Sequence, residues 1–184
     1  MGRIEALIDM TAIPEKVWEM VLVAFIVAII FWLIWPMLIG AQWIPTPMNI
    51  VKKMLELADV QEGDVVIDLG SGDGRIITTA AKEYKARAIG IEADPIRLIW
   101  SRVNIRNNGL SEKVKVLWGN FFDKDLEEAT VVTIYQNQET NKKLKPKFEK
   151  ELEPGTRIVS HVFTFDGWEP KKVDQESQIY LYLV

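Results

Sequence analysis

Beyond residue 44, short apolar runs alternate with longer stretches in which apolar residues recur every three or four positions. The short runs predict strands, and the longer stretches predict amphipathic helices. Strands that alternate with helices predict an α/β fold, with a mostly parallel sheet covered on both faces. The expected strands are 64–69, 86–92, 113–118, 129–136, 156–164 and 178–184, and the expected helices are 47–58, 75–85, 94–107 and 138–152.

The carboxyl-terminal end of the chain departs from this alternation. Its last two apolar runs, Trp168–Val173 and Ser177–Val184, are separated by only a few residues. A parallel crossover needs about a dozen residues or more, so we expect these two strands to form an antiparallel hairpin that closes the sheet.

Capping signals mark the ends of two expected helices. Thr46 precedes Pro47 and Asp94 precedes Pro95, so each pair offers a capping side chain and a proline suited to the first helical position. The run Asn107-Asn108-Gly109 is a typical helix stop. These signals support the helix starts and one helix end.

The amino-terminal part has a different pattern, because the run from Met20 to Ile39 contains no charged residue. A helix of this length reaches about 30 Å, which matches the hydrocarbon core of a bilayer. Trp18 lies before this run, Trp35 lies near its end and Trp43 follows it, and tryptophans gather at membrane interfaces. We therefore expect one transmembrane helix.

A buried core helix and a cleavable signal peptide are weaker interpretations of this run. The core helix is disfavoured because a small α/β domain rarely contains a helix that is apolar on every face. The signal peptide is disfavoured because acidic residues precede the run and no small-residue cleavage site follows it. We expect an amino-terminal flank over residues 1–16, a retained transmembrane anchor over 17–40 and the main domain over 41–184.

Composition limits the classes of function that this domain can have. The net charge of −4 provides no positive surface for the phosphate backbone of a nucleic acid. The chain has no cysteine and a single histidine, His161, so disulfides and thiolate zinc sites are excluded and a histidine metal site is not expected. His161 lies inside an expected strand, and we interpret it as a structural residue. We expect neither a nucleic acid nor a metal as a partner.

The most specific motif is a glycine-rich turn after the first expected strand, Asp68-Leu69-Gly70-Ser71-Gly72-Asp73-Gly74. Glycines permit positive φ and remove the side chains that would keep a ligand away from the backbone. The next helix then points its free N–H groups into the turn. A dinucleotide fingerprint would need glycine at position 75, where the chain has Arg75, so a different nucleotide-like ligand is expected.

A second carboxylate lies where a nucleotide would need it. The second expected strand ends in Glu92, and a carboxylate can accept both hydroxyl protons of a ribose. Together, the glycine turn and Glu92 resemble motif I and the following acidic residue of the class I S-adenosylmethionine-dependent methyltransferases. The resemblance implies S-adenosyl-L-methionine as the cofactor and a Rossmann-like sheet with an antiparallel carboxyl-terminal hairpin.

The resemblance also implies which residues bind this cofactor. The glycine turn would cradle its methionine part, and Glu92 would hold the ribose hydroxyls. Asn120 would bind the exocyclic amine of the adenine, since an amide oxygen is an acceptor, and Phe121 would stack on the ring. The implied set is Asp68, Gly70, Ser71, Gly72, Gly74, Arg75, Glu92, Asn120 and Phe121.

A narrower resemblance concerns the substrate. Pro45-Thr46-Pro47 and Ser160-His161-Val162-Phe163 look like the corresponding segments of small archaeal protein-lysine methyltransferases. They also look like those of the membrane-anchored mitochondrial enzymes that modify the ATP synthase c subunit and the adenine nucleotide translocase. The stretch Tyr135-Gln136-Asn137 departs from the apolar stretch of the mitochondrial members, so the resemblance leaves the target protein open.

The end of the fourth expected strand bears on the acceptor of the methyl group. The Asn/Asp-Pro-Pro-Tyr motif of adenine-N6 methyltransferases is missing there, which argues against base methylation. The chain has Tyr135 at this place, and the face of its ring can hold a cationic amine. We expect Tyr135, with Thr46 nearby, to form an amine pocket, and a core tyrosine at a strand end is the alternative.

These features predict a single-pass, membrane-anchored methyltransferase that acts on accessible lysines of proteins, membrane-embedded proteins included, with the bilayer as a second partner. Because S-adenosylmethionine is a cytosolic-type cofactor, we expect the catalytic domain on the cytoplasmic or matrix side of the membrane. A methyltransferase for a lipid or quinone, and a non-catalytic cofactor-binding scaffold, are the alternatives.

Overall fold

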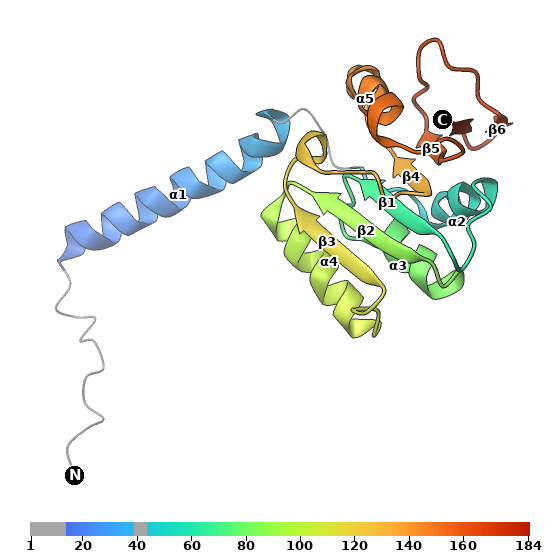
Figure 1. Cartoon of the computed structure of the whole chain (residues 1–184). Coiled ribbons are helices and arrows are strands. Elements are labelled where there is room, and N and C mark those ends of the chain that lie inside the picture. The colour runs from blue at the N-terminus through green and yellow to red at the C-terminus, as the bar shows by residue number, and fades with distance from the viewer. Residues whose placement is uncertain (1–13, 39–43) are drawn as a thin grey trace. The chain divides into compact units, whose positions relative to one another are not determined.

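The computed structural model describes residues 14–38 and 44–184 of the chain. The chain divides into two units, Met1–Gln42 and Trp43–Val184, and each is described by itself (Figure 1). The first unit contains the helix α1 (Glu15–Leu38), and the second contains a seven-stranded sheet with the helices that cover it.

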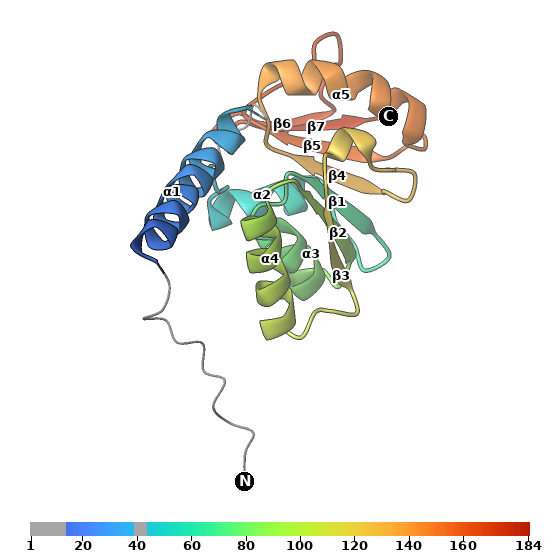
Figure 2. The same ribbon diagram turned by 90° about the vertical axis from the view of Figure 1, so that its left-hand side faces the viewer.

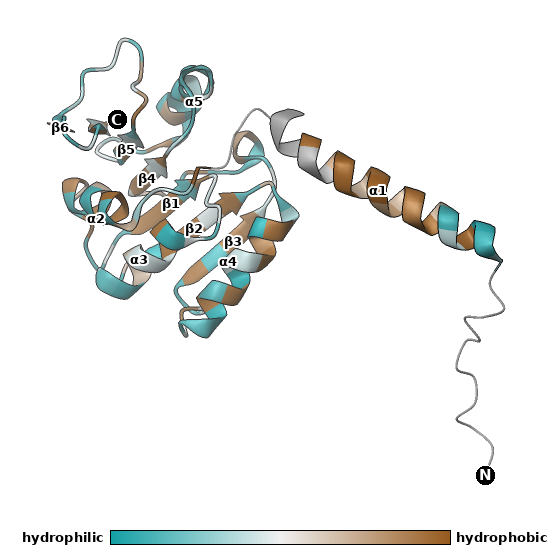
Figure 3. Cartoon of the chain, turned by 180° about the vertical axis from the view of Figure 1, so that it is seen from behind, coloured by the Kyte–Doolittle hydropathy of each residue, from teal (hydrophilic) through white to brown (hydrophobic). Residues whose placement is uncertain are grey.

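α1 exposes apolar side chains around its circumference. Its described side chains are exposed at every position from Glu15 to Phe31 and at Ile34, and Figure 3 shows mostly hydrophobic residues along its middle. Within the described part of the chain, however, no helix reaches the length and apolarity that a membrane crossing requires. The transmembrane anchor predicted over 17–40 is therefore not confirmed.

Only part of the predicted anchor is described. The uncharged part of α1 with described side chains runs from Met20 to Phe31, which is shorter than the roughly 20 residues that span a bilayer. The side chains at 32, 33 and 35–38, and all of residues 39–43, lie outside the described residues. The same holds for residues 1–13 of the predicted amino-terminal flank.

The second unit is built on a sheet with the strand order β3-β2-β1-β4-β5-β7-β6. Neighbours from β3 to β5 are parallel, whereas β7 runs antiparallel to both β5 and β6. The predicted α/β sheet and its antiparallel closing hairpin are confirmed. The strands are β1 (Val65–Leu69), β2 (Arg87–Glu92), β3 (Val114–Trp118), β4 (Val131–Ile134), β5 (Arg157–His161), β6 (Lys172–Asp174) and β7 (Ile179–Leu183).

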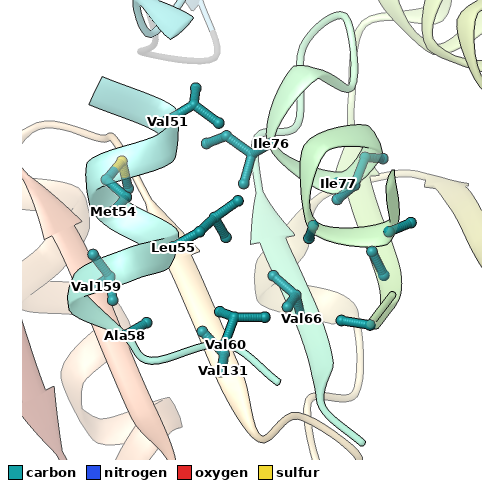
Figure 4. Packing of buried hydrophobic residues seen from close by; sticks show 14 of the residues in the cluster. Val51, Met54, Leu55, Ala58, Val60, Val66, Ile76, Ile77, Val131 and Val159 are labelled. Atoms are coloured by element: carbon teal, nitrogen blue, oxygen red, sulfur yellow. The ribbon is translucent and has the colours of Figure 1, made fainter. Parts of the chain in front are cut away.

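Helices cover both faces of this sheet (Figure 2). Successive side chains of a strand point to opposite faces, so Val66 joins one buried cluster and Val65 and Ile67 join the other. The first cluster includes residues of α2 (Met48–Leu57), α3 (Arg75–Glu83) and α4 (Pro95–Asn107), and the second includes residues of α5 (Gln138–Glu151). Figure 4 shows the first cluster, with Val51 of α2 directed toward Ile76 of α3.

Two strands end earlier than predicted. β4 ends at Ile134 rather than 136, because the next residues leave the sheet to reach Asn137, which caps α5 by accepting a 2.8 Å hydrogen bond from Thr140 N. β5 ends at His161 rather than 164, because Val162 has a φ of +69°, and a left-handed residue cannot continue a strand.

The closing hairpin is also shorter than predicted. β6 begins at Lys172 rather than 168. Trp168 packs instead against Phe165, with ring centroids 5.3 Å apart, and against Tyr182 at 6.0 Å. The Trp168 side chain therefore packs against the core beside α5, and the residue is not part of a strand.

The capping predictions have different outcomes. Asp94 caps α4 as predicted, because its side chain accepts hydrogen bonds from Ile96 N at 2.8 Å and Arg97 N at 3.0 Å. Asn108 is the C-cap of α4, and Gly109 follows with a φ of +68°. The prediction that Thr46 caps α2 is wrong, because Pro47 is the N-cap and no side chain makes a capping bond there.

Candidate active site

The carboxyl ends of β1 and β4 lie side by side at the centre of the sheet, where the strand order reverses direction. From β1 the chain continues outward to β2 and β3, and from β4 it continues to β5 on the other side. Open α/β sheets bind ligands in the crevice outside such a switch point. The glycine turn follows β1 and Tyr135 follows β4, so the fold brings both predicted features to this crevice.

The glycine turn has a backbone that only glycine adopts without strain. Gly70, Gly72 and Gly74 have φ values of +86°, +56° and +79°. A Cβ atom on Gly70 would lie 2.4 Å from Gln136 Nε2, and one on Gly74 would lie 2.2 Å from Ser101 Oγ. The conformation therefore favours glycine at all three positions, and at Gly70 and Gly74 there is also little space for a side chain.

Hydrogen bonds to β2 hold the start of this turn. The N–H groups of Gly70 and Ser71 both donate to the Ile91 carbonyl, at 2.9 and 3.0 Å. The Ser71 side chain is buried next to Gly90, where an added Cβ would meet Ser71 Oγ at 2.5 Å. Within the described residues its hydroxyl has no hydrogen-bond partner. The serine side chain thus packs beneath the turn, between it and β2.

Glu92 connects the turn to the end of β2. Its buried carboxylate accepts hydrogen bonds from Gly72 N at 2.7 Å and from Asp94 N at 2.8 Å, through different oxygens. Arg97 Nη1 lies 3.8 Å from the same carboxylate. Each carboxylate oxygen has a further lone pair, so Glu92 can orient the turn and still accept from ribose hydroxyls.

Asp68 is the buried carboxyl of the motif. It pairs in register with Thr133 of β4, and the Thr133 hydroxyl donates to it at 2.8 Å. Burial raises the pKa of Asp68 to about 7, against the opposing effect of the Thr133 hydrogen bond, and the charges of Glu92 and Asp73 add to the rise. The residue therefore titrates near neutral pH beneath the crevice at the carboxyl ends of β1 and β4.

Arg75 links the turn to the segment that leads into α2. Its guanidinium donates to Asp73 Oδ2 at 2.6 Å and to the Thr46 carbonyl at 2.8 Å. The ion pair with Asp73 raises the pKa of Arg75. Thr46 is buried, and this bond brings its backbone beside the glycine turn. Asp73 lies in the predicted motif, but its pairing with Arg75 was not anticipated.

Asn120 and Phe121 follow β3 and reach the same edge of the sheet. Gly119 N donates to the Glu92 carbonyl at 3.0 Å, which places the start of this loop beside the end of β2. Asn120 is exposed, and its Oδ1 accepts a 3.0 Å hydrogen bond from Phe122 N. Phe121 is half-buried with its ring centroid 4.9 Å from that of Phe122.

Tyr135 and His161 form an aromatic pair across the ends of β4 and β5. Their ring centroids are 4.4 Å apart with an interplanar angle of 55°. His161 is buried, and its Nδ1 has no hydrogen-bond partner within the described residues. Burial lowers the pKa of His161 below its ordinary value, although a hydrogen bond with the Ser177 backbone opposes this shift. Sequence reasoning assigned His161 to structure alone, because the predicted strand ran to residue 164, whereas His161 is the last residue of β5.

Gln136 is a further residue that sequence reasoning missed. Its Nε2 donates to the Leu69 carbonyl at 3.2 Å and lies over Gly70. The amide therefore closes one side of the turn and connects the loop after β4 to the end of β1. No group of three His, Cys, Asp or Glu side chains in the described ranges could hold a metal ion.

Comparison with known proteins identifies the family. The profile of the ANTKMT methyltransferase domain matches residues 68–172. A protein-lysine N-methyltransferase of Saccharolobus islandicus is 46% identical over 149 residues, which are 77% of this chain and 92% of that protein. The lysine N-methyltransferase of Xenopus laevis that is named for the ATP synthase c subunit is 28% identical over 131 residues. The match covers 71% of this chain but only 57% of the Xenopus protein.

A solved structure has the same fold with a bound form of the cofactor. A crystal structure named as an RNA methyltransferase from Salinibacter ruber, in complex with S-adenosyl-L-homocysteine, is 45% identical with a TM-score of 0.75. The match covers 77% of this chain and 94% of that one. Its ligand is the demethylated product of S-adenosyl-L-methionine, so the predicted cofactor is confirmed. The chain therefore belongs to the S-adenosyl-L-methionine-dependent protein-lysine N-methyltransferase family that contains the ANTKMT methyltransferase domain.

Proposed function

We propose that this protein transfers a methyl group from S-adenosyl-L-methionine to the ε-amine of a lysine in a protein substrate. The observation that carries the proposal is the pairing of Tyr135 with His161 at the ends of adjacent strands, next to the strand that leads into the glycine turn. The relative named as a protein-lysine N-methyltransferase, at 46% identity, supports it.

The cofactor residues follow the order of the strands. We assign the glycine turn after β1 to the methionine part, Glu92 after β2 to the ribose, and Asn120 with Phe121 after β3 to the adenine. Neighbouring strands are about 4.8 Å apart, so these three positions extend over roughly 10 Å of the sheet edge. That distance suits an extended nucleoside. The bound cofactor supplies a methyl group on a positively charged sulfur, so its leaving group needs no acid.

The amine pocket has to favour a neutral lysine. A lysine ammonium has a pKa of about 10.4 in water, and removal from water disfavours its charged form. The face of Tyr135 can hold the ammonium as it enters. Burial lowers the pKa of His161, so the ring is neutral at physiological pH and adds no positive charge. We assign Thr46, which Arg75 holds beside the turn, to the wall of this pocket.

Alignment of the amine with the methyl group is then the main task of the protein. In-line displacement at a carbon atom depends on the relative position of the two reactants, and holding them in place can supply several kcal/mol of the barrier. The half-buried Tyr135 and the buried His161 are suited to this positioning, because packed rings have little freedom to rotate.

RNA is a second candidate acceptor, because the 45%-identical structure from Salinibacter ruber is named as an RNA methyltransferase. An RNA backbone needs positive charge on the protein, whereas this chain has a net charge of −4. The charge of the chain thus favours a protein substrate over RNA.

We further propose that the amino-terminal segment holds the enzyme at a membrane, with the catalytic domain on the cytoplasmic or matrix side. The support is the apolar sequence of α1, whose described side chains are exposed around the helix. A helix without a polar face is poorly suited to water. Such an anchor would raise the local concentration of membrane-embedded substrates. Sedimentation with membranes after an alkaline carbonate wash tests it, and release of the full chain by that wash would refute it.

The acceptor class can be tested with methyl-labelled cofactor. The full chain is incubated with cell membranes and with total RNA, and the label is then followed separately in protein, extractable lipid and RNA. We expect label in protein, recovered as methyl-lysine after acid hydrolysis, and none with the Tyr135→Ala variant. Label confined to lipid or to RNA would refute the lysine proposal, and binding of the cofactor without any transfer would indicate a scaffold.

A further inference from the structure

α4 has an apolar stripe on its outer face. Ile96, Ile99, Trp100 and Val103 are 47%, 60%, 60% and 48% exposed. Residues three and four positions apart lie on the same face of a helix, so these side chains form one continuous stripe. The inner face of α4 is separate, because Leu98 and Ile105 are buried in the core.

The stripe continues onto the edge strand of the sheet. β3 is the outermost strand on this side, and Trp118 at its end is 63% exposed. The Trp118 indole N–H donates to the Ala93 carbonyl at 3.2 Å, directly before the cap of α4. Arg102 of α4 in turn reaches the Val116 carbonyl of β3 at 3.4 Å. We call the exposed side chains of this region the α4 surface, namely Ile96, Ile99, Trp100, Val103 and Trp118.

Two exposed arginines, Arg102 and Arg106, flank the α4 surface, whereas Arg97 is paired with Glu92 and Asp94 at the start of the helix. Between Pro95 and Asn107, α4 contains Arg97, Arg102 and Arg106 but no acidic residue, although the whole chain has a net charge of −4. Figure 3 shows hydrophobic and hydrophilic residues interleaved along this helix. Apolar and aromatic side chains flanked by arginines are typical of helices that lie in the interface of an anionic bilayer.

Charge also indicates which partner binds to the α4 surface. A second copy of the chain would bring the arginines of two α4 helices close together, and like charges oppose association. A lysine-rich protein would meet the same repulsion. An anionic lipid surface attracts the arginines and accepts the tryptophans at headgroup depth.

We propose that the α4 surface rests on a bilayer that contains anionic lipids. The surface adjoins the cofactor site, because Ile96 follows the Glu92–Asp94 corner and Trp118 ends β3 just before Asn120. Contact there brings the edge of the sheet that carries the glycine turn toward the plane of the membrane. This orientation favours acceptor groups that lie close to the bilayer surface. The proposal does not depend on which group accepts the methyl.

The absence of cysteine from the chain allows a direct test. Ile99→Cys in the full chain accepts a single environment-sensitive fluorophore on the α4 surface. Lys150→Cys is the matched control, because this residue is exposed on α5, the helix of the opposite face of the sheet. Both proteins are mixed with phosphatidylcholine vesicles, with and without phosphatidylglycerol.

We expect the fluorophore at position 99 to brighten and shift to the blue only with anionic vesicles, and the one at position 150 to stay unchanged. Charge reversal by Arg102→Glu with Arg106→Glu should reduce the apparent binding about tenfold or more. The thermal midpoint should fall only slightly, because both side chains are exposed and the change removes the 3.4 Å bond of Arg102 to the Val116 carbonyl and a basic residue from the last turn of α4. Equal spectra at position 99 with either vesicle would overturn the proposal. A spectrum that follows protein concentration rather than lipid charge would also overturn it, in favour of self-association.

Discussion

Thr133 donates a 2.8 Å hydrogen bond to the carboxylate of Asp68, its register partner on the neighbouring strand, and both side chains are buried. The hydrogen bond favours the charged carboxylate, but burial outweighs it and raises the pKa of Asp68 to about 7. Ionisation of Asp68 therefore lowers the free energy of unfolding.

This relationship predicts how stability depends on pH. The ordinary pKa of the residue is 3.8 and the folded value is about 7, so at intermediate pH the folded state keeps a proton that the unfolded chain has released. Stability should fall as pH rises through this range. Asp68→Asn cannot titrate and can still accept from Thr133, so it should raise the free energy of unfolding by up to about 4 kcal/mol at mildly alkaline pH. Urea unfolding at several pH values measures this, and parallel pH profiles for parent and variant would contradict it.

Glu92 should be needed for cofactor affinity. Glu92→Ala removes an acceptor for ribose hydroxyls and leaves the N–H groups of Gly72 and Asp94 without their partner, so affinity should fall about tenfold or more. Titration calorimetry with S-adenosyl-L-homocysteine measures the change. Glu83→Gln is the control, because Glu83 is exposed and pairs with Lys52 at 2.9 Å. Equal affinities of Glu92→Ala and parent would remove Glu92 from the site.

Gly74 should not tolerate a side chain. Gly74→Ala places a methyl group 2.2 Å from Ser101 Oγ at a φ of +79°, which should lower the free energy of unfolding by about 1–3 kcal/mol. Gly63→Ala is the matched control, because nothing lies within 4 Å of its added Cβ. Adding Ser101→Ala to Gly74→Ala should recover part of the loss but not the part due to φ. A Gly74→Ala variant as stable as the control would contradict this account.

His161 can be observed on its own, because it is the single histidine of the chain. Burial lowers the pKa of His161, so its imidazole proton signals should titrate below pH 6.5, the ordinary value of the residue. Tyr135→Ala removes the ring that lies 4.4 Å away and admits water, so the pKa should rise toward that ordinary value. A proton NMR titration of both proteins measures the difference. An unchanged pKa in the variant would show that Tyr135 does not shield His161.

Local signals in the sequence predicted much of the fold. Asp94 with Pro95 marked the start of α4, and the few residues between the last two apolar runs marked the antiparallel hairpin of β6 and β7. Thr46 carried the same kind of signal as Asp94 but has another role, because its carbonyl is held by Arg75 from a distant helix. The role of Thr46 is set by a contact between segments far apart in the sequence. Such a contact cannot be predicted from the local helix-capping signal.

The site was predictable only in part for the same reason. Gly70, Gly72 and Gly74 were recognisable because their spacing is local. The contact of Tyr135 with His161 depends on the pairing of β4 with β5, and the position of Gln136 over Gly70 depends on the pairing of β1 with β4. The exposed apolar stripe of α4 could not be predicted from the sequence, because apolar residues lie on both faces of that helix.

The Ile91 carbonyl, which accepts from both Gly70 N and Ser71 N, has a kinetic consequence. Together with the bond from Gly72 N to Glu92, it holds the turn through hydrogen bonds within the protein itself. A receptor that is shaped in advance loses little conformational entropy on capture. Uptake of the methyl donor should therefore proceed close to the encounter rate, and the lifetime of each complex should depend on how quickly the spent donor leaves.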